Sequence, residues 1–441
     1  MRMHFLSCRK DFGEMIEKKL RKFIVPSVFA MLGISLYVLA DTFFISVAAG
    51  ADGITALNMA LPVYAIMYAV GSMIGIGSAT RYSLDKSLGK EDYDVYFSNS
   101  FVCTLLLSLF FVAIGIFAPG NVLRLMGADD NILKTGISYM RIALLFAPAF
   151  MLNYTMTAFV RNDNNPGIAM AATLSSSIFN IIFDYIFMFP MNMGISGAAL
   201  ATGISPIVSM AVCLLHYCSE KNTIRLVKKL PSAQKLILAC QLGISAFVGE
   251  ISGGVTTLTF NFVLLKIAGN IGVAAYGVVA NISIVGIAVF NGISQGLQPM
   301  ASEAGGAGDE DAKKRICRHS LQIGMIISAL LVFVCWIFAD GIVAVFNSEG
   351  SAQMAGYAAA GLRLYSLGFL IAAANIVRAG FFGAIGSAKE CFIISLMRGI
   401  VAIVFFAVVL SKFMGIYGVW LAFPAAELTT FMISMAVRRS I

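Results

Sequence analysis

Long apolar runs recur along the whole chain, and they constrain its fold more than any other feature. Each run is roughly 20 residues long, which is the length an α-helix needs to cross the ~30 Å hydrocarbon core of a bilayer. Only 12% of the residues are charged and 59% are hydrophobic, whereas about 25% charged residues are usual in a soluble protein. The chain has too few polar groups to cover a surface facing water, so we expect lipid to surround it.

Helix is the state that suits these runs, because a bilayer requires internally paired backbone groups and the runs are too long for barrel strands. The sequence predicts an all-α membrane protein with about twelve transmembrane helices. The first run has no small-residue cleavage site and precedes many others, so we interpret it as a span and not as a removable signal. The predicted spans are 23–47, 54–80, 97–118, 134–159, 166–189, 194–217, 236–265, 271–300, 316–338, 355–381, 388–411 and 415–437.

The distribution of basic residues predicts the orientation of the chain. With the N-terminus in the cytoplasm, most of the 31 lysines and arginines fall in segments on the cytoplasmic side. The segments assigned to the outer side hold only Arg124, Lys134, Lys266 and Lys412. Cytoplasmic segments carry such an excess in multi-pass proteins. We therefore expect a bacterial-type plasma (inner) membrane protein with both termini in the cytoplasm.

The second half of the chain repeats the first. Residues 193–201 (MGISGAALA) open the sixth predicted span and residues 414–422 (MGIYGVWLA) open the twelfth. Each half therefore holds six helices, and an even number relates the halves by a pseudo-two-fold axis along the membrane normal. We expect a cytoplasmic N-terminal arm at 1–22, an N-lobe at 23–217, a cytoplasmic linker at 218–235 and a C-lobe at 236–441.

Such a duplication favours a transporter, since two similar bundles that rock against each other give alternating access to a site at the midplane. No G-x-x-x-x-G-K-[ST] phosphate loop is present, so ATP is not expected to drive the process directly. We expect no catalytic residues, no cofactor, no nucleic acid and no obligate protein partner. The eight cysteines and three histidines show no zinc-ligand spacing, and we predict neither a metal site of that kind nor a disulfide framework.

Acidic residues inside the spans are the candidate functional groups, because an ionisable group in hydrocarbon is costly and is usually functional. Asp41 in the first span and Asp184 in the fifth lie at similar predicted depths. Tyr37 precedes Asp41 by four residues and Asn180 precedes Asp184 by four, so each shares a helix face with its acid. Thr202 in the sixth span lies at a comparable depth.

These oxygen-bearing side chains suit a hard cation such as Na⁺. A buried pair of carboxyl groups can instead share a proton. A third reading is that the acids only pair with arginine or cap broken helices. The aligned positions of the second half, near Phe260 and Phe406, carry no acid, which favours a functional role for Asp41 and Asp184.

Three further residues are assigned less specific roles. Glu250 in the seventh span is a possible C-lobe site for an ion or a cationic substrate, or a partner of Arg378 or Arg398. Glu427 is interpreted as structural. Pro26 removes a backbone hydrogen bond in the first span and is either a possible hinge or a static kink.

The chain resembles the multidrug and toxic compound extrusion (MATE) family. The segments that carry the resemblance are ADTFFI at 40–45, RNDNNP at 161–166, NIIFDYIFMF at 180–189 and MGISGAALAT at 193–202. The resemblance implies two six-helix lobes in a V and antiport against Na⁺ or H⁺. In the family, the acid of the first span and the Asn/Asp pair of the fifth form the cation site of the N-lobe, with a threonine of the sixth span nearby. The matching residues here are Asp41, Asn180, Asp184 and Thr202.

The resemblance also implies organic, cationic and amphipathic substrates, while some branches use an acid at the position of Glu250. Residues 45–47 (ISV) depart from the family, where many relatives have a glycine after the apolar pair. Two alternatives differ in function. A lipid-linked oligosaccharide flippase would require deep basic residues for a diphosphate, of which this chain has few. An intramembrane enzyme would require a catalytic cluster, and only residues 91–94 (EDYD) are candidates.

Overall fold

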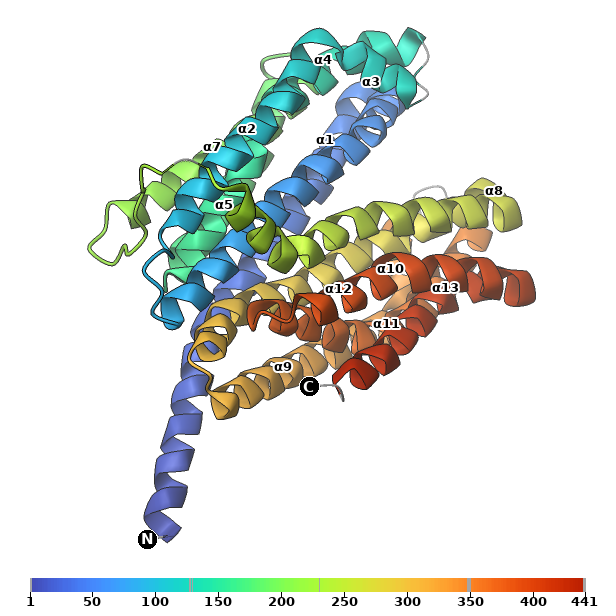
Figure 1. The fold of residues 1–441 in the computed structure, drawn as a ribbon. Coiled ribbons are helices and arrows are strands. Elements are labelled where there is room, and N and C mark those ends of the chain that lie inside the picture. Colours follow the sequence, from blue (N-terminus) through green and yellow to red (C-terminus); the bar gives the residue numbers. More distant parts are fainter. Residues whose placement is uncertain (1, 127, 129, 230, 347–349, 439–441) are drawn as a thin grey trace. The chain divides into compact units, whose positions relative to one another are not determined.

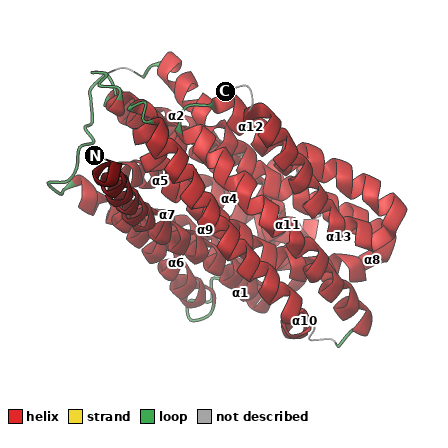
Figure 2. Ribbon diagram, turned by 90° about the horizontal axis from the view of Figure 1, so that it is seen from below, coloured by secondary structure: helices red, strands yellow, loops and turns green. Residues whose placement is uncertain are grey.

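A computed structural model describes residues 2–126, 128, 130–229, 231–346 and 350–438 of the chain (Figure 1). Within these residues helix is the only regular secondary structure and there is no β-strand (Figure 2). The elements are α1 (Arg2–Ser87), α2 (Val95–Phe117), α3 (Pro119–Leu125), α4 (Asp130–Leu145), α5 (Ala147–Asn162), α6 (Pro166–Met188), α7 (Ile195–Tyr217), α8 (Ala233–Gly306), α9 (Glu310–Ile337), α10 (Ala339–Phe346), α11 (Ala352–Ala384), α12 (Ala388–Leu396), the π-helix η1 (Met397–Val401) and α13 (Ala402–Arg438).

Three of the long helices contain a sharp turn between two spans, and a single glycine makes each turn. These are Gly50 in α1 (φ 57°, ψ −148°), Gly269 in α8 (φ 62°, ψ −155°) and Gly415 in α13 (φ 58°, ψ −134°). Residues with a Cβ atom almost never adopt this conformation. Gly194, which precedes α7, has it as well (φ 55°, ψ −140°). The repeat-related glycines 50 and 269, and 194 and 415, therefore share one backbone geometry.

The glycine turns explain the number of spans. In the described part of the chain, nine helices are long and apolar enough to cross a membrane, or ten when the bent pair Gly136–Leu145 and Ala147–Asn162 is one span. Two of these, Ala233–Gly306 and Ala388–Ala436, contain a glycine turn and have the length, 74 and 49 residues, for two crossings each. Counting each of them twice gives twelve, which confirms the prediction of an all-α membrane protein with about twelve spans.

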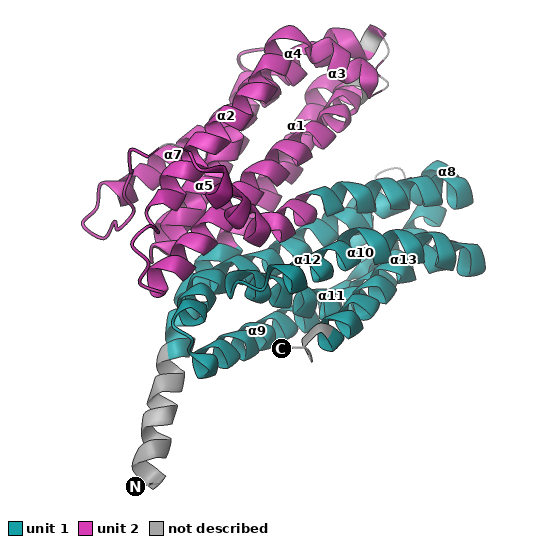
Figure 3. Cartoon of the chain, in the orientation of Figure 1, with its two compact units in different colours: residues 1–28, 251–441 teal, residues 29–250 magenta. Residues whose placement is uncertain are grey.

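The chain forms two compact units (Figure 3). Unit 2 consists of Phe29–Glu250, and unit 1 consists of Met1–Val28 together with Ile251–Ile441. These boundaries differ from the expected linker at 218–235, because they lie inside the first and the seventh predicted spans. Unit 1 thus contains the opening part of the first span, and unit 2 contains the opening part of the seventh.

Close glycine packing accounts for this division. Within unit 2, a Cβ atom built on Gly243 would lie 1.9 Å from the carbonyl oxygen of Met73. Within unit 1, a Cβ atom built on Gly296 would lie 2.6 Å from the Cα atom of Ile24. Only glycine permits helix backbones to approach this closely. The start of α8 is therefore packed against the second span in unit 2, and residues 16–28 of α1 are packed against the eighth span in unit 1.

The middle of unit 2 positions the predicted site. Helices α6 and α7 are joined by a short turn and pack side by side, α5 packs against both, and α2 packs against α5. Buried apolar side chains from α1, α4, α5 and α7 fill the space between the helices, including Met67, Tyr139, Met151 and Ala198. Since α6 and α7 are neighbours, residues at similar depth on them can meet.

Candidate functional site

Asp41 and Asp184 lie next to each other inside unit 2. Asp41 is on the first span of α1, nine residues before the Gly50 turn, and Asp184 is in the last turn of α6. Their exposed fractions are 8% and 0%. The two carboxyl groups are close enough for each to act on the ionisation of the other. The structure thus brings together the two acids that the sequence assigns to one site.

Asn180 and Thr202 complete the polar cluster. Asn180 lies one helical turn before Asp184 and is fully buried, and Thr202 is 7% exposed on α7. The side-chain amide nitrogen of Asn180 donates a hydrogen bond of 3.1 Å to Thr202 Oγ1. This bond fixes the orientation of the amide, so its carbonyl oxygen is held on the other side of the side chain.

Several oxygens of this cluster lack a donor. Asp41 Oδ1, Asn180 Oδ1 and both carboxyl oxygens of Asp184 are buried and, while both acids are ionised, have no hydrogen-bond donor among the described residues. A proton on one of the two carboxyl groups would join Asp41 to Asp184 by a hydrogen bond. A buried polar atom left without a partner costs about 1–3 kcal/mol. Two adjacent carboxylates in addition repel each other. A cation or a proton bound among these oxygens removes both costs, and oxygen ligands are those that Na⁺ prefers by analogy with other hard cations.

The described arginines and lysines do not neutralise these acids. No ion pair within the described residues includes Asp41 or Asp184. Arg398 instead pairs with Glu427, with 2.7 Å between Nη2 and Oε1. Neither acid lies at a helix N-terminus, where a carboxylate would act as a cap.

Tyr37 belongs to a group of tyrosines beside the acids. It lies one turn before Asp41, and its hydroxyl group interacts with that of Tyr68. The ring of Tyr68 lies 5.9 Å from that of Tyr64 and 6.0 Å from that of Tyr154. Tyr64, Tyr68 and Tyr154 are not among the residues predicted from the sequence. The spacing of Tyr64 and Tyr68, four residues apart on one helix face, is a signal that could have found two of them.

Glu250 lies at the boundary of the compact units and belongs to unit 2. Its Oε1 accepts a hydrogen bond of 3.1 Å from the hydroxyl group of Tyr154 on α5. Arg398 is paired with Glu427, while a pair of Glu250 with Arg378 or Arg398, like a C-lobe site at Glu250, stays a prediction. Within unit 2, Tyr154 links Glu250 to the tyrosines beside Asp41.

The corresponding region of unit 1 is built differently. Phe260, which aligns with Asp41, is fully buried and packs against the rings of Tyr276 and Tyr365, at 5.0 and 6.1 Å. Glu427 is 1% exposed, but Asn375 Nδ2 donates to its Oε2 at 2.8 Å and Arg398 to its Oε1. Among the described spans, the cluster of carboxyl oxygens without donors is thus a property of unit 2.

Comparison with known proteins identifies the family. The sequence pattern described as MatE matches residues 26–186 and 246–408, which is more than half of the chain. The chain belongs to the MATE family. Its resemblance to that family, first seen in four short segments, is confirmed over both halves of the sequence.

Relatives of this MATE protein cover nearly its whole length. The multidrug export protein MepA of Staphylococcus saprophyticus is 26% identical over 391 residues, which cover 88% of this chain and 85% of the relative. The protein of the same name from Staphylococcus haemolyticus is 25% identical over 432 residues, which cover 96% and 93%.

Solved structures share the fold. An outward-facing multidrug resistance MATE family transporter of the MOP superfamily has a TM-score of 0.90 at 22% identity, covering 96% of this chain and 95% of that chain. A MOP superfamily transporter from Pyrococcus furiosus has a TM-score of 0.88 at 22% identity, with the same coverage. At this level of identity the likeness establishes the two-lobed MATE fold.

Pro26 lies within a continuous helix of this MATE protein. The backbone of α1 stays helical through Pro26, and its one non-helical residue in the described part is Gly50. The boundary between the compact units follows two residues later, between Val28 and Phe29. A hinge role for Pro26 therefore stays a prediction, with the unit boundary as the structural reason to test it.

Proposed function

We propose that this MATE family protein exports organic compounds in exchange for a cation, Na⁺ or H⁺, by alternating access, and that Asp41, Asn180, Asp184 and Thr202 hold the cation. The observation that supports this most directly is the set of buried oxygens without donors on Asp41, Asn180 and Asp184. Such a set is costly when empty and satisfied when a cation is bound. Its occupancy can therefore change the relative stability of two conformations, which coupled transport requires.

Multidrug export is the substrate class that the relatives support. The two MepA proteins are named for multidrug export, and cationic, amphipathic compounds are the substrates we expect here. A lipid-linked oligosaccharide flippase is less well supported. It would need basic side chains free to bind a diphosphate, whereas the partly buried Arg398 is already paired with Glu427.

The residues would divide the work as follows. Asp41 and Asp184 supply the negative charge, and Asn180, oriented by Thr202, supplies a neutral oxygen. Tyr37 lies on the same helix face as Asp41 and is hydrogen-bonded to Tyr68. A change in the charge of Asp41 would therefore act on Tyr68 through Tyr37. Binding of a cation, or of protons, cancels the repulsion between the two carboxylates and allows the helices that carry them to pack more closely.

We expect the protein to be a secondary transporter without a cofactor and not an enzyme. Its expected location is the bacterial plasma membrane, with both termini in the cytoplasm, since the basic residues gather in the segments assigned to that side. Small organic molecules and lipid are the expected partners.

Ion-driven efflux of ethidium from vesicles tests the proposal. Imposed Na⁺ and H⁺ gradients are applied separately to the wild type, and the effective ion is then used for Asp41→Asn and Asp184→Asn. We expect both variants to lose gradient-driven efflux and to retain ethidium binding. Coupled efflux at the wild-type rate in both variants would show that these acids do not carry the coupling ion.

A further inference from the structure

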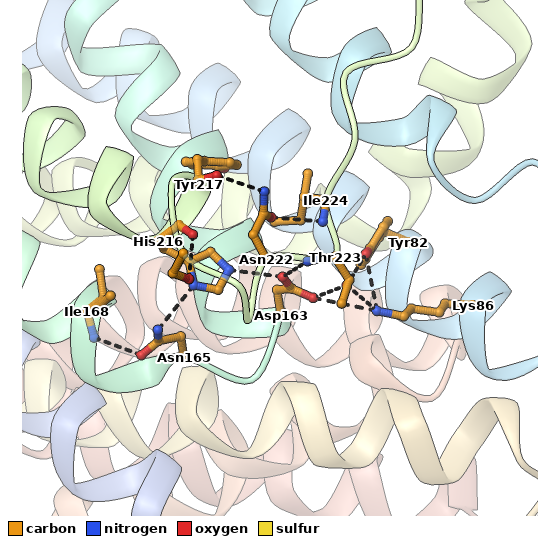
Figure 4. Close-up of polar contacts among 11 residues, drawn as sticks. Tyr82, Lys86, Asp163, Asn165, Ile168, His216, Tyr217, Asn222, Thr223 and Ile224 are labelled. Atoms are coloured by element: carbon orange, nitrogen blue, oxygen red, sulfur yellow. Dashed lines mark hydrogen bonds and ion pairs between the residues drawn. The ribbon is translucent and has the colours of Figure 1, made fainter.

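A second buried polar cluster lies at the end of unit 2 where α5 meets α6 (Figure 4). Asp163 follows the last residue of α5, Asn165 precedes the first residue of α6, and His216 is in the last turn of α7. Thr223 belongs to the segment that connects α7 to α8, and Lys86 is near the end of α1. We call these five residues the Asp163–His216 cluster.

Asp163 is the acceptor at the centre of this cluster. It is 4% exposed, and His216 is fully buried. Asp163 Oδ2 accepts from His216 Nε2 at 2.9 Å and from the backbone N–H of Thr223 at 2.8 Å, while Oδ1 accepts from the Thr223 hydroxyl group. Lys86 Nζ lies 3.5 Å from Oδ1 and balances the charge. A carboxylate with this many donors is stable in a buried position.

The contacts of Asn165 determine which nitrogen of His216 carries the proton. Asn165 Oδ1 accepts from the backbone N–H of Ile168 and caps α6, so its Nδ2 group is the one that faces His216. Nδ2 donates to His216 Nδ1 at 3.1 Å, which requires an unprotonated Nδ1. The proton is therefore on Nε2, where it is donated to Asp163. His216 is a neutral ring that joins the end of α5 to the start of α6.

The same cluster holds the start of the connecting segment. Thr223 is bonded to Asp163, and the next residue, Ile224, is buried among Tyr82, Phe159 and their neighbours. Further along, the backbone N–H of Ser232 donates to Asn99 Oδ1 at 2.6 Å. Residues 223–232, apart from Leu230, which lies outside the described residues, are thus attached to unit 2 at both ends.

The cluster and the candidate cation site share two helices. Asn165 caps the N-terminus of α6, and Asn180 and Asp184 lie toward its C-terminus. Helix α7 carries both Thr202 and His216. A helix transmits a displacement along its axis because its hydrogen-bonded backbone is stiff. Pro206 removes one such bond from α7 between Thr202 and His216, but the helix continues through it from Ile195 to Tyr217. His216 on α7 is bonded to Asn165, the cap of α6. This bond fixes the position of α7 along the axis of α6, and therefore the distance between Thr202 and Asn180.

We propose that Asp163, Asn165 and His216 are positioning residues, which set the register of α6 against α7 and thereby the affinity of the cation site. The inference rests on the function proposed above. In its neutral Nε2–H form, His216 donates from Nε2 to Asp163 and accepts at Nδ1 from Asn165. A side chain with one amide donor and one carbonyl acceptor would serve equally well.

That requirement gives a matched pair of variants. His216→Gln retains one donor and one acceptor at a similar spacing, whereas His216→Phe keeps a ring but has neither. We expect His216→Phe to raise the cation concentration for half-maximal efflux by roughly threefold to tenfold, within the range by which residues that touch neither ligand change coupling between distant sites, with the maximal rate kept within about twofold. His216→Gln should restore the wild-type value. Where His216→Phe does not fold, Asn165→Ala, which removes the same bond, takes its place.

A further variant separates helix register from release of the connecting segment. Asn99→Ala frees Ser232 at the far end of that segment without touching α6 or α7. We expect it to leave the cation dependence unchanged. Equal losses in Asn99→Ala and His216→Phe would overturn the proposal, because the effect would then arise from the segment and not from the register.

Nitrogen NMR of the imidazole provides a readout that does not depend on transport. The chain has three histidines, so ¹⁵N-histidine labelling with His216→Gln as the assignment control identifies the His216 signals. A protonated Nε2 and an unprotonated Nδ1 at pH 7.5 are expected, and the opposite tautomer or an imidazolium would overturn the proposal. If the tautomer is as expected but wild-type efflux responds to neither ion, the proposed function fails and not the assignment of the cluster.

Discussion

The side-chain amide nitrogen of Asn180 lies 3.1 Å from Thr202 Oγ1, which joins α6 to α7 inside the candidate cation site. Replacing Thr202 by valine keeps the shape of the side chain and removes the acceptor. The amide of Asn180 is then free to rotate, and its oxygen is no longer held as a ligand. We expect Thr202→Val to weaken cation binding by about tenfold, the equivalent of one hydrogen bond of about 1.4 kcal/mol.

Isothermal titration of the purified protein with the coupling cation measures this change. Thr202→Ser, which retains the hydroxyl group, is the control and should bind as the wild type does. Unchanged affinity in Thr202→Val would mean that the orientation of Asn180 has no part in binding.

Removing the charge of Asp184 should stabilise the cation-free protein. Asp184 is fully buried beside Asp41, and neither of its oxygens has a donor in the described residues. Asp184→Asn relieves the repulsion between the acids, so we expect a Tm about 1 °C higher without the cation, which corresponds to ~1 kcal/mol for a chain of 441 residues. The stabilisation that the cation gives to the wild type should be absent in the variant. A lower Tm in the variant without cation would contradict this interpretation.

Glu427 provides a contrasting case, since it is buried but paired. Glu427→Gln leaves the guanidinium of Arg398 without its partner, and breaking a buried pair costs about 3–5 kcal/mol. We expect a marked fall in Tm, with the cation dependence of efflux retained in the folded fraction. The exposed pair of Arg363 and Asp340, at 2.8 Å, is the control, because Asp340→Asn should cost less than ~1 kcal/mol.

Two glycines six residues apart on α8 should respond differently to alanine. A Cβ atom on Gly243 would lie 1.9 Å from the Met73 carbonyl oxygen, whereas one on Gly249 would have no atom within 4 Å. Gly243→Ala must push two helices apart, and we expect it to cost about 1–3 kcal/mol. Gly249→Ala should be neutral or stabilising by up to ~1 kcal/mol. Thermal unfolding in detergent compares the two, and similar Tm values would argue against close packing at Gly243.

The attachment of the connecting segment should depend on pH through Asp92. A hydrogen bond from Lys229 at 3.0 Å, with the nearby charge of Lys235, lowers the pKa of the Asp92 carboxyl group. A lowered pKa means that the contact contributes above about pH 3.9, the value in the unfolded chain, and is lost as the pH falls through the folded value. At pH 7, Asp92→Asn should mimic the acid form and speed hydrogen exchange in residues 225–229, whereas Glu91→Gln should not.

The sequence predicts the membrane architecture well because the determinants are local. Span length and the repeat are visible in single stretches, and the turn glycines 50 and 269 occur at equivalent places in both halves. The similar depth of Asp41 and Asp184 could also be predicted, since both depths follow from distances along straight helices. Whether the two side chains face each other could be seen only in the folded structure.

Other features depend on packing between distant segments and leave little trace in the sequence. The division of the chain at Val28 and Glu250 follows from backbone contacts of Gly243 and Gly296. Nothing in the sequence distinguishes these two among the 41 glycines. The spacing of the three histidines does not distinguish His216 from the other two. Its role required the proximity of Asp163, 53 residues earlier, which no local pattern reports.

The exchange of acids for phenylalanines in the second repeat has an electrical consequence. The described residues hold one cluster of carboxyl groups without donors, so each cycle can carry at most the few charges that Asp41 and Asp184 neutralise. If one monovalent cation enters for each monovalent organic cation that leaves, no net charge crosses the membrane. The rate of efflux would then depend on the concentration gradient of the ion and not on the membrane potential. Dissipating the membrane potential alone should therefore leave the efflux rate unchanged.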